Sequence, residues 1–245
     1  MSGDSAAPRF ALVTGGGTGI GAACCRALAA EGFRVGVHYR SSEATARALA
    51  DELRGALLFR ADLGVPEEID ALVGELKQRA GRVDVLVNNA GYNVNAPMLT
   101  MKLDDYDAVA RVARGTWYLT KAVLRRFMFR NGGRIINISS VVGHTGNPGQ
   151  IPYTMVKAGL DAFTKSLAQE LAGREVAVNS IAPGFIDTEM TTELPEEIRQ
   201  AILARIPMQR MGRPEEVADA VAWLATRAAY VHGTIIHVNG GMFGG

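Results

Sequence analysis

Short apolar runs alternate with longer helical patterns along almost the whole chain, and this alternation limits the fold more than any other feature. Strand-length runs are expected at residues 10–14, 33–39, 56–60, 83–88, 134–138, 176–181 and 234–238. Helical patterns are expected at residues 19–31, 42–54, 66–79, 103–130, 152–171, 196–204 and 214–226. Seven strands separated by helices predict an α/β fold built on a doubly wound, parallel, seven-stranded sheet.

No linker, repeat or low-complexity segment divides the chain, so we expect a single domain over residues 9–245. Residues 1–8 are small and polar and lack the basic and apolar regions of a signal peptide, so they are expected to form a disordered tail. The alternation breaks at residues 185–212, a polar segment with one weak helix. An insertion at this end of the sheet is predicted to form a substrate lid.

Composition limits the partners of the chain. Its 26 Lys and Arg residues almost balance its 25 Asp and Glu residues, which gives no reason to expect binding to nucleic acid or to a membrane surface. No apolar run reaches the length of about 18 residues that a membrane span needs. The only cysteines, Cys24 and Cys25, are adjacent and are not expected to pair, so a reducing cytoplasm is the expected location. Neither a disulfide nor a metal is needed for a core of this size.

A glycine-rich motif follows the first expected strand and opens the first expected helix. At such a position, bare backbone N–H groups and the helix dipole favour a pyrophosphate, as in the dinucleotide sites of Rossmann folds. We therefore predict that this motif binds the phosphates of a dinucleotide; a glycine-rich turn without a ligand is the alternative. The predicted residues are Thr14, Gly15, Gly17, Thr18, Gly19, Ile20 and Gly21.

The end of the second expected strand indicates which dinucleotide binds, because NAD enzymes place an acidic residue there against the ribose hydroxyls. This chain has His38, Tyr39, Arg40, Ser41 and Ser42 at that point, with no carboxylate. Arg40 is able to pair with a ribose 2′-phosphate and the serine hydroxyls to donate to it, so NADPH is the predicted cofactor. The alternative is that Arg40 is an ordinary solvated charge.

Tyr153 and Lys157 lie four residues apart behind Pro152, at the start of an expected helix, so their side chains share one face. In a partly dry site, an ammonium stabilises the phenolate of a neighbouring tyrosine and allows it to exchange a proton near neutral pH. Taken alone, such a pair is usually a surface contact. Ser140, however, follows a central strand at its carboxyl end, where doubly wound folds bind ligands, thirteen residues before Tyr153.

The run from Asn137 through Ser140, Tyr153 and Lys157 to residues 179–184 resembles the short-chain dehydrogenase/reductase family, and the resemblance covers nearly the whole chain. It implies that Tyr153 protonates a carbonyl oxygen, that Lys157 holds the nicotinamide ribose and that Ser140 orients the substrate. It also implies cofactor contacts by Asp62, Leu63, Asn89, Ala90, Gly91, Tyr153, Lys157, Pro183, Gly184, Ile186 and Thr188. Taken singly, Asp62 reads equally as a turn or helix cap and Asn89 as a strand-end hydrogen bonder.

Within the family, segments 143–150, 183–190, 206–210 and 239–241 resemble bacterial 3-oxoacyl-acyl-carrier-protein reductases most. The resemblance implies NADPH-dependent reduction of a 3-oxoacyl thioester on an acyl carrier protein, in fatty-acid or polyketide-like synthesis. One alternative keeps the chemistry but acts on a free ketone, sugar or steroid. Another is a catalytically weak, cofactor-binding subunit of a synthase.

Two expectations concern partners. The family usually forms homotetramers, which implies assembly through the long helices at 103–130 and 152–171 and the apolar C-terminal strand and tail. A basic patch made by Arg125, Arg126, Arg130 and Arg174 is predicted to dock an acidic carrier protein near the site. The alternative is that these arginines form an ordinary solvated helix face or an oligomer contact.

The chain departs from the family at one position. The family usually places an Asn in the long helix, three residues before a pair such as Gly115 and Thr116, where it supports a proton relay to the lysine. Counting back from this pair gives Val112, whereas counting forward from Tyr106 gives Ala113. The counts differ by one residue, as deletion of the Asn itself would produce. We therefore expect Lys157 to lack this support, although hydride transfer is not excluded.

Overall fold

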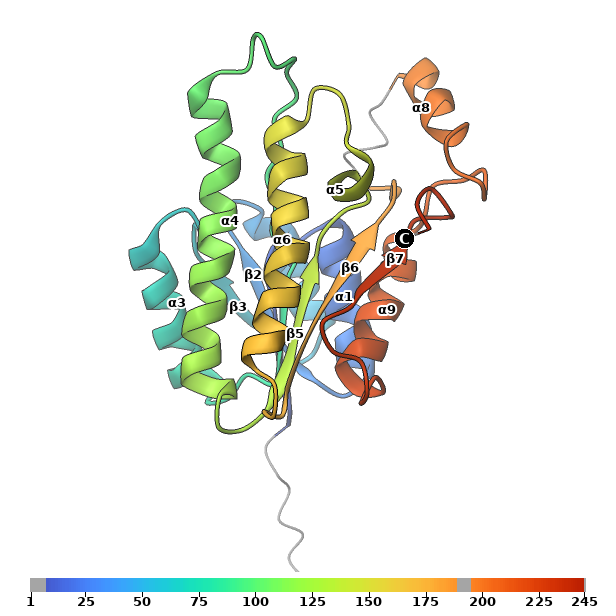
Figure 1. The fold of residues 1–245 in the computed structure, drawn as a ribbon. Helices are drawn as coiled ribbons and strands as arrows, with labels where there is room; N and C mark the ends of the chain where they lie inside the picture. Colours follow the sequence, from blue (N-terminus) through green and yellow to red (C-terminus); the bar gives the residue numbers. More distant parts are fainter. Residues whose placement is uncertain (1–7, 189–194, 245) are drawn as a thin grey trace, which may run out of the picture.

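The computed structural model describes residues 8–188 and 195–244, in which seven strands form one parallel sheet (Figure 1). The order is β3-β2-β1-β4-β5-β6-β7, and every neighbouring pair is parallel. The chain therefore leaves β1 in one direction and returns to pair β4 on its other edge, which confirms the predicted doubly wound sheet. The strands are β1 Phe10–Val13, β2 Arg34–Tyr39, β3 Leu57–Arg60, β4 Val85–Asn88, β5 Gly133–Ile138, β6 Val176–Pro183 and β7 Ile235–Val238.

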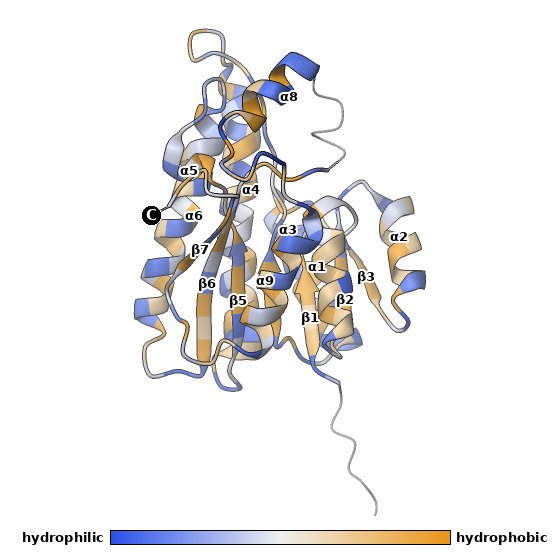
Figure 2. Ribbon diagram, turned by 90° about the vertical axis from the view of Figure 1, so that its right-hand side faces the viewer, coloured by the Kyte–Doolittle hydropathy of each residue, from blue (hydrophilic) through white to orange (hydrophobic). Residues whose placement is uncertain are grey.

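Helices cover both faces of the sheet (Figure 1). One layer contains α1 Gly19–Ala30, α2 Glu43–Glu52 and α9 Pro214–Thr226, whose buried residues belong to one apolar core. The other contains α3 Pro66–Arg79, α4 Leu103–Val123 and α6 Ile151–Glu170, whose buried residues belong to a second core. In Figure 2 the strands are mostly apolar, as expected for a sheet that is buried on both faces.

The pleat of β1 divides its side chains between these two cores. Phe10 and Leu12 pack into the core beneath α3, α4 and α6, whereas Ala11 and Val13 pack into the core beneath α1 and α9. The ring of Phe10 meets that of Phe59 edge to face, with centroids 6.4 Å apart. These four residues are almost fully buried, so β1 forms the centre from which the cofactor motif leaves the sheet.

Two elements differ from the sequence prediction. The helix expected over residues 103–130 is α-helical only to Val123 and continues as a π-helical turn, η1, at Leu124–Met128. This wider turn buries Phe127 and Met128 and leaves Arg125 and Arg126 exposed. A short helix that was not predicted, α5 at Val142–Thr145, follows β5 directly.

The predicted lid segment is described at residues 185–188 and 195–212. Its expected helix is confirmed as α8, Glu196–Leu203, which lies beyond the carboxyl ends of the strands (Figure 1). Ile202, Ile206 and Met211 form a small apolar cluster of their own, against which Met242 near the C-terminus packs. The predictions for residues 1–7, 189–194 and 245 lie outside the described residues.

Two further features concern the described part of the chain. Cys24 and Cys25 are both fully buried in α1, and burial raises the pKa of Cys24 to about 12, so this thiol is neutral at physiological pH. No helix within residues 8–188 and 195–244 has the length and apolarity that crossing a membrane requires.

Candidate active site

The glycine motif forms a tight loop between β1 and α1. Gly15 and Gly19 have φ angles of 61° and 50°, in the left-handed region that favours glycine. A Cβ at Gly21 would overlap the carbonyl oxygen of Gly15 and lie 2.6 Å from Asn89 Nδ2. The loop therefore folds directly over the first turn of α1, in which Ile20 and Gly21 lie, with exposed Thr18 at its N-cap.

Hydrogen bonds from the end of β4 hold this loop in place. The backbone N–H groups of Asn89 and Ala90 donate to Thr14 Oγ1 at 2.9 and 3.0 Å. Asn89 Nδ2 donates to the carbonyl oxygens of Thr14 and Gly15 at 2.9 and 3.1 Å. Asn89 is thus a strand-end hydrogen bonder in this structure, and its amide group aligns the loop; a contact with the ribose remains a proposal.

His38 is a site residue that the sequence reasoning missed. Its Nδ1 accepts a hydrogen bond from the Gly15 N–H at 3.1 Å, and its carbonyl accepts one from the Gly16 N–H at 2.8 Å. Its Nε2 lies 3.0 Å from the carbonyl oxygen of Ala61. Burial lowers the pKa of His38 to about 4, so the ring is neutral and its one proton lies on Nε2. A polar residue at the end of an otherwise apolar strand was the available signal.

The residues predicted to bind the adenosine half gather at the ends of β2 and β3. Arg40 and Ser41 are exposed, and the guanidinium of Arg40 lies 5.8 Å from the ring centroid of Tyr92. Asp62 Oδ1 accepts a hydrogen bond from the Gly64 N–H at 2.8 Å, so its carboxylate also stabilises a turn. Leu63 is buried, and its carbonyl lies so close to Gly115 that a Cβ there would overlap it.

The segment after β6 reaches the same end of the sheet. The carbonyl of Pro183 accepts from the Val141 N–H at 2.8 Å, and the Gly184 N–H donates to Val238 at 2.9 Å. Ile186 is buried and pairs with Gly212 in an isolated parallel bridge. Thr188 lies against the start of α1, where a Cβ on Gly19 would contact its methyl group at 3.4 Å. The structure thus brings this segment to the glycine loop.

Lys157 joins the predicted catalytic residues. Its side chain is 5% exposed, and its Nζ donates to the carbonyl oxygen of Ile138, the last residue of β5, at 2.7 Å. The same Nζ lies 5.4 Å from the ring centroid of Tyr153 and would lie 3.7 Å from a Cβ on Gly91. Ser140 follows β5 by two residues, and its Oγ accepts from the Val142 N–H at 3.3 Å. One end of β5 therefore carries all three predicted groups.

This arrangement has a chemical consequence. An ammonium that is almost fully buried favours a nearby negative charge more strongly than a solvated one does, since little water screens it. Tyr153 is only partly buried and its phenol stays accessible from the site. The pair therefore combines an accessible proton donor with a buried cation that stabilises the conjugate base.

A cavity of about 230 Å³ lies between α4 and α6, beside Lys157 and Tyr153. Both positions that the family spacing gives for the missing Asn, Val112 and Ala113, line this cavity. Thr116 also lines it, but its hydroxyl donates to the carbonyl of Val112 at 3.0 Å. The wall that α4 presents to Lys157 is therefore apolar, as the departure in the sequence predicts. The described residues contain no cluster of acidic, His and Cys side chains that could hold a metal.

Comparisons with known proteins give the chain its relatives. A family model described as enoyl-(acyl carrier protein) reductase matches residues 15–243. A 3-oxoacyl-[acyl-carrier-protein] reductase of Aquifex aeolicus is 45% identical over 242 residues, which cover 96% of this chain and 97% of that protein. The protein of that name from Escherichia coli is 43% identical over 241 residues, covering 96% and 97%. Nodulation protein G of a Rhizobium strain is 46% identical over 239 residues, covering 96% of each chain.

Proposed function

Because the chain belongs to the short-chain dehydrogenase/reductase family, we propose that it is an NADPH-dependent 3-oxoacyl-[acyl-carrier-protein] reductase. It reduces the 3-oxoacyl thioester to the 3-hydroxyacyl thioester in cytoplasmic fatty-acid or polyketide-like synthesis. The observation that carries the proposal is the contact of Lys157 with Ile138 and Tyr153, which gathers the predicted catalytic groups beside the glycine loop. Relatives of about 45% identity whose names state this activity support it.

The residues present fit a dinucleotide, because the glycine loop leaves no room for side chains and begins a helix whose N-terminus favours a pyrophosphate. Thr14, Gly15, Gly17, Thr18, Gly19, Ile20 and Gly21 would hold the phosphates, and Pro183, Gly184, Ile186 and Thr188 would line the nicotinamide. When bound, NADPH supplies the hydride that is added to the carbonyl carbon.

The chain supplies the proton and the orientation. Ser140 donates a hydrogen bond to the carbonyl oxygen of the substrate, and Tyr153 transfers its phenolic proton to that oxygen as the carbon gains the hydride. The product is the neutral alcohol, and the phenolate that Tyr153 becomes is stabilised by Lys157. Lys157 also holds the nicotinamide ribose. The phenolate then regains its proton from solvent before the next turnover.

The direct test measures loss of NADPH absorbance with a 3-oxoacyl thioester, on carrier protein and as a free thioester. A 2-enoyl thioester is the matched comparison, since the description of the family model names enoyl reduction. We expect oxidation of NADPH with the 3-oxoacyl substrate and not with the enoyl substrate. Activity on the enoyl thioester alone would replace this proposal with that reaction, and no activity on either would favour a cofactor-binding subunit.

We predict that Arg40→Asp weakens NADPH binding by about 10- to 150-fold, because a charge-assisted contact contributes about 1.5 to 3 kcal/mol. NADH binding should weaken far less, since NADH has no 2′-phosphate. Affinities for both dinucleotides, from fluorescence titration, check this. Arg54→Asp is the matched control, because Arg54 is an exposed arginine beyond the other end of α2. Unchanged NADPH affinity in Arg40→Asp would remove Arg40 from the cofactor site.

We predict that the protein is a homotetramer. Large apolar side chains are exposed on α4 and α6, among them Trp117 at 49% and Met155 at 55%. Both lie on the two helices that border the cavity beside Lys157, so a second copy packed there would cover apolar surface. Light scattering at micromolar concentration should give about four times the chain mass of 26.1 kDa. A monomeric mass would contradict the prediction.

The predicted basic patch forms, but at the other end of the sheet. Arg125, Arg126 and Arg130 line a concavity of about 580 Å³ with Lys77, and the guanidinium of Arg174 lies 4.3 Å from the ring centroid of Phe129. These residues precede β5 and β6, whereas Ser140 follows β5. The six residues of β5 separate the patch from the site by about 20 Å. It therefore does not adjoin the site of its own chain.

We propose that this patch docks the acidic carrier protein. Arg130→Glu with Arg174→Glu should lower kcat/KM for the carrier-bound substrate by about tenfold or more, by removing electrostatic steering. The kcat/KM for a short free thioester should stay nearly unchanged, and the wild-type rate with carrier protein should fall as salt rises. Equal losses on both substrates would indicate structural damage, and no loss on either would rule out docking there.

A further inference from the structure

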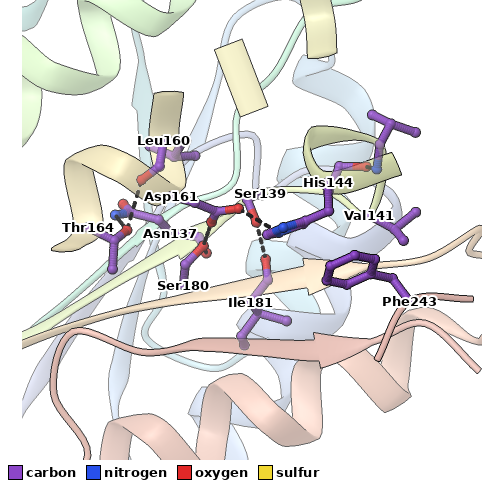
Figure 3. A network of polar contacts seen from close by, with 12 residues as sticks. Asn137, Ser139, Val141, His144, Leu160, Asp161, Thr164, Ser180, Ile181 and Phe243 are labelled. Atoms are coloured by element: carbon purple, nitrogen blue, oxygen red, sulfur yellow. Dashed lines mark hydrogen bonds and ion pairs between the residues drawn. The ribbon is translucent and has the colours of Figure 1, made fainter. Parts of the chain in front are cut away.

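A buried polar network lies behind the predicted catalytic residues (Figure 3). Its centre is Asp161 on α6, whose side chain is 5% exposed. Asp161 Oδ1 accepts a hydrogen bond from Ser180 Oγ of β6 at 2.6 Å, and Asp161 Oδ2 lies 2.9 Å from His144 Nε2 of α5. The glycine motif, Arg40 and the Tyr153–Lys157 pair account for the proposed reaction without this network, so its presence calls for another role.

The contact between His144 and Asp161 is the main polar interaction of both groups. Neither His144 Nε2 nor Asp161 Oδ2 has another hydrogen-bond partner among the described residues, and both atoms are inaccessible to solvent. A carboxylate in such surroundings is costly unless it is paired, and removal of one partner from a buried pair typically costs about 3 to 5 kcal/mol. The two side chains are therefore held to each other.

The ring of His144 is also held from its other side. It stacks on Phe243 with centroids 4.9 Å apart, and it meets His237 of β7 edge to face at 4.8 Å. Burial, and next the charge of His144, lower the pKa of His237, which is therefore mostly neutral at pH 7. Asn239 Nδ2 donates to the carbonyl of Phe243 at 2.9 Å, which fixes the position of that ring.

Through α5 this contact reaches Ser140. The first turn of α5 is built on Ser140, whose Oγ accepts from the Val142 N–H and whose carbonyl accepts from the Gly143 N–H at 3.0 Å. Gly143 packs so closely on α6 that a Cβ there would lie 2.9 Å from the backbone nitrogen of Ala158. His144 is the next residue, so its contact with Asp161 joins the helix that follows Ser140 to the helix that carries Tyr153 and Lys157.

The order of the contacts excludes a hydrolytic triad. Ser180 is fully buried, and its hydroxyl donates to the aspartate rather than to the histidine. A nucleophilic serine needs a base and access to substrate, and Ser180 has neither.

We propose that His144 and Asp161 are a positioning pair, which fixes α5, and with it the Ser140 hydroxyl, against α6. The effect on catalysis rests on the proposed carbonyl reduction, whereas the effect on α5 does not. A pair of this kind sets the rate because a misplacement of about 1 Å at a catalytic group costs about 100-fold.

Three variants test the pair. His144→Leu with Asp161→Leu removes both polar groups and leaves no buried charge, and Ser180 retains the carbonyl of Asn137 as an acceptor at 3.2 Å. His144→Gln keeps an N–H donor at the end of a side chain of similar reach. His232→Leu is the control, because His232 joins α6 to β6 at the other end of the sheet, through Ala168 and Val178.

Amide hydrogen exchange is measured over residues 141–146, alongside kcat, KM and the affinity for NADPH. In the double variant we expect exchange in α5 about tenfold faster or more. Its kcat should fall by about 10- to 100-fold, with KM and NADPH affinity nearly unchanged. His144→Gln and His232→Leu should stay close to wild type in both exchange over 141–146 and kcat.

Unchanged exchange or unchanged kcat in the double variant would overturn the proposal. So would an equal loss in His144→Gln, because the ring rather than the polar contact would then be responsible. If the wild type does not reduce the 3-oxoacyl thioester, the proposed function fails. In that case the exchange of α5 alone decides whether the pair fixes the Ser140 segment.

Discussion

Tyr153→Phe is expected to lower turnover of the 3-oxoacyl thioester by about 10²- to 10⁴-fold, the usual contribution of a general acid. The substitution removes only the hydroxyl, so the ring stays beside Lys157 and the hydrogen bond from Lys157 to Ile138 is kept. NADPH should therefore bind as it does to the wild type. Steady-state oxidation of NADPH measures the first effect and fluorescence titration the second.

Tyr230→Phe is the matched control, because Tyr230 is fully exposed and far along the chain from the site. It should leave both turnover and NADPH affinity unchanged. If Tyr153→Phe retained most of the wild-type turnover while its thermal midpoint stayed normal, Tyr153 would not be the acid. Equal loss of turnover and of NADPH affinity would instead point to a role in cofactor binding alone.

Gly21→Ala is expected to have the second large effect, on the cofactor loop. The new Cβ would overlap the Gly15 carbonyl oxygen and crowd Asn89 Nδ2 at 2.6 Å, and the first of these is backbone, which cannot rotate away. The loop must shift, which should weaken at least two charge-assisted contacts with the pyrophosphate and reduce NADPH affinity by about 100-fold or more. Overpacking should also destabilise the ligand-free protein by about 1 to 3 kcal/mol.

The same substitution elsewhere provides the control. Gly74 lies inside α3, and a Cβ there would have no atom within 4 Å. Gly74→Ala should therefore stabilise the protein by up to about 1 kcal/mol, the difference in helix propensity, without changing NADPH affinity. Calorimetry of the ligand-free proteins and NADPH titration compare the two variants. Normal NADPH binding by Gly21→Ala would mean that the loop does not need its observed conformation.

The sequence predicts those features of the molecule that depend on neighbouring residues. The seven strands and the expected helices appear close to their predicted positions, because a period of 2 or 3.6 in the apolar residues is a local signal. The spacing of Tyr153 and Lys157 likewise places them on one helix face without knowledge of the rest of the fold. The glycine motif is similar, since its conformation is largely a property of its own residues.

Features that depend on contacts between distant segments were missed. His38 aligns the glycine loop across 23 residues, and His144 meets Asp161 only because α5 folds back onto α6. The basic patch was placed near the site, although a helix between parallel strands runs antiparallel to them. The end of α4 that leads into β5 must therefore lie at the amino end of that strand, and the sequence did contain this information.

Tyr153, Lys157 and Asp161 follow one another at intervals of four residues along α6. Four residues turn an α-helix by about 400°, so each step rotates the side chain about 40° past a full turn, and two steps rotate it about 80°. The row therefore winds from the side that meets the substrate to the side that meets α5 and the sheet. Rotation of α6 about its own axis would move all three groups at once, which makes the azimuth of this one helix a single coordinate for both proton transfer and packing.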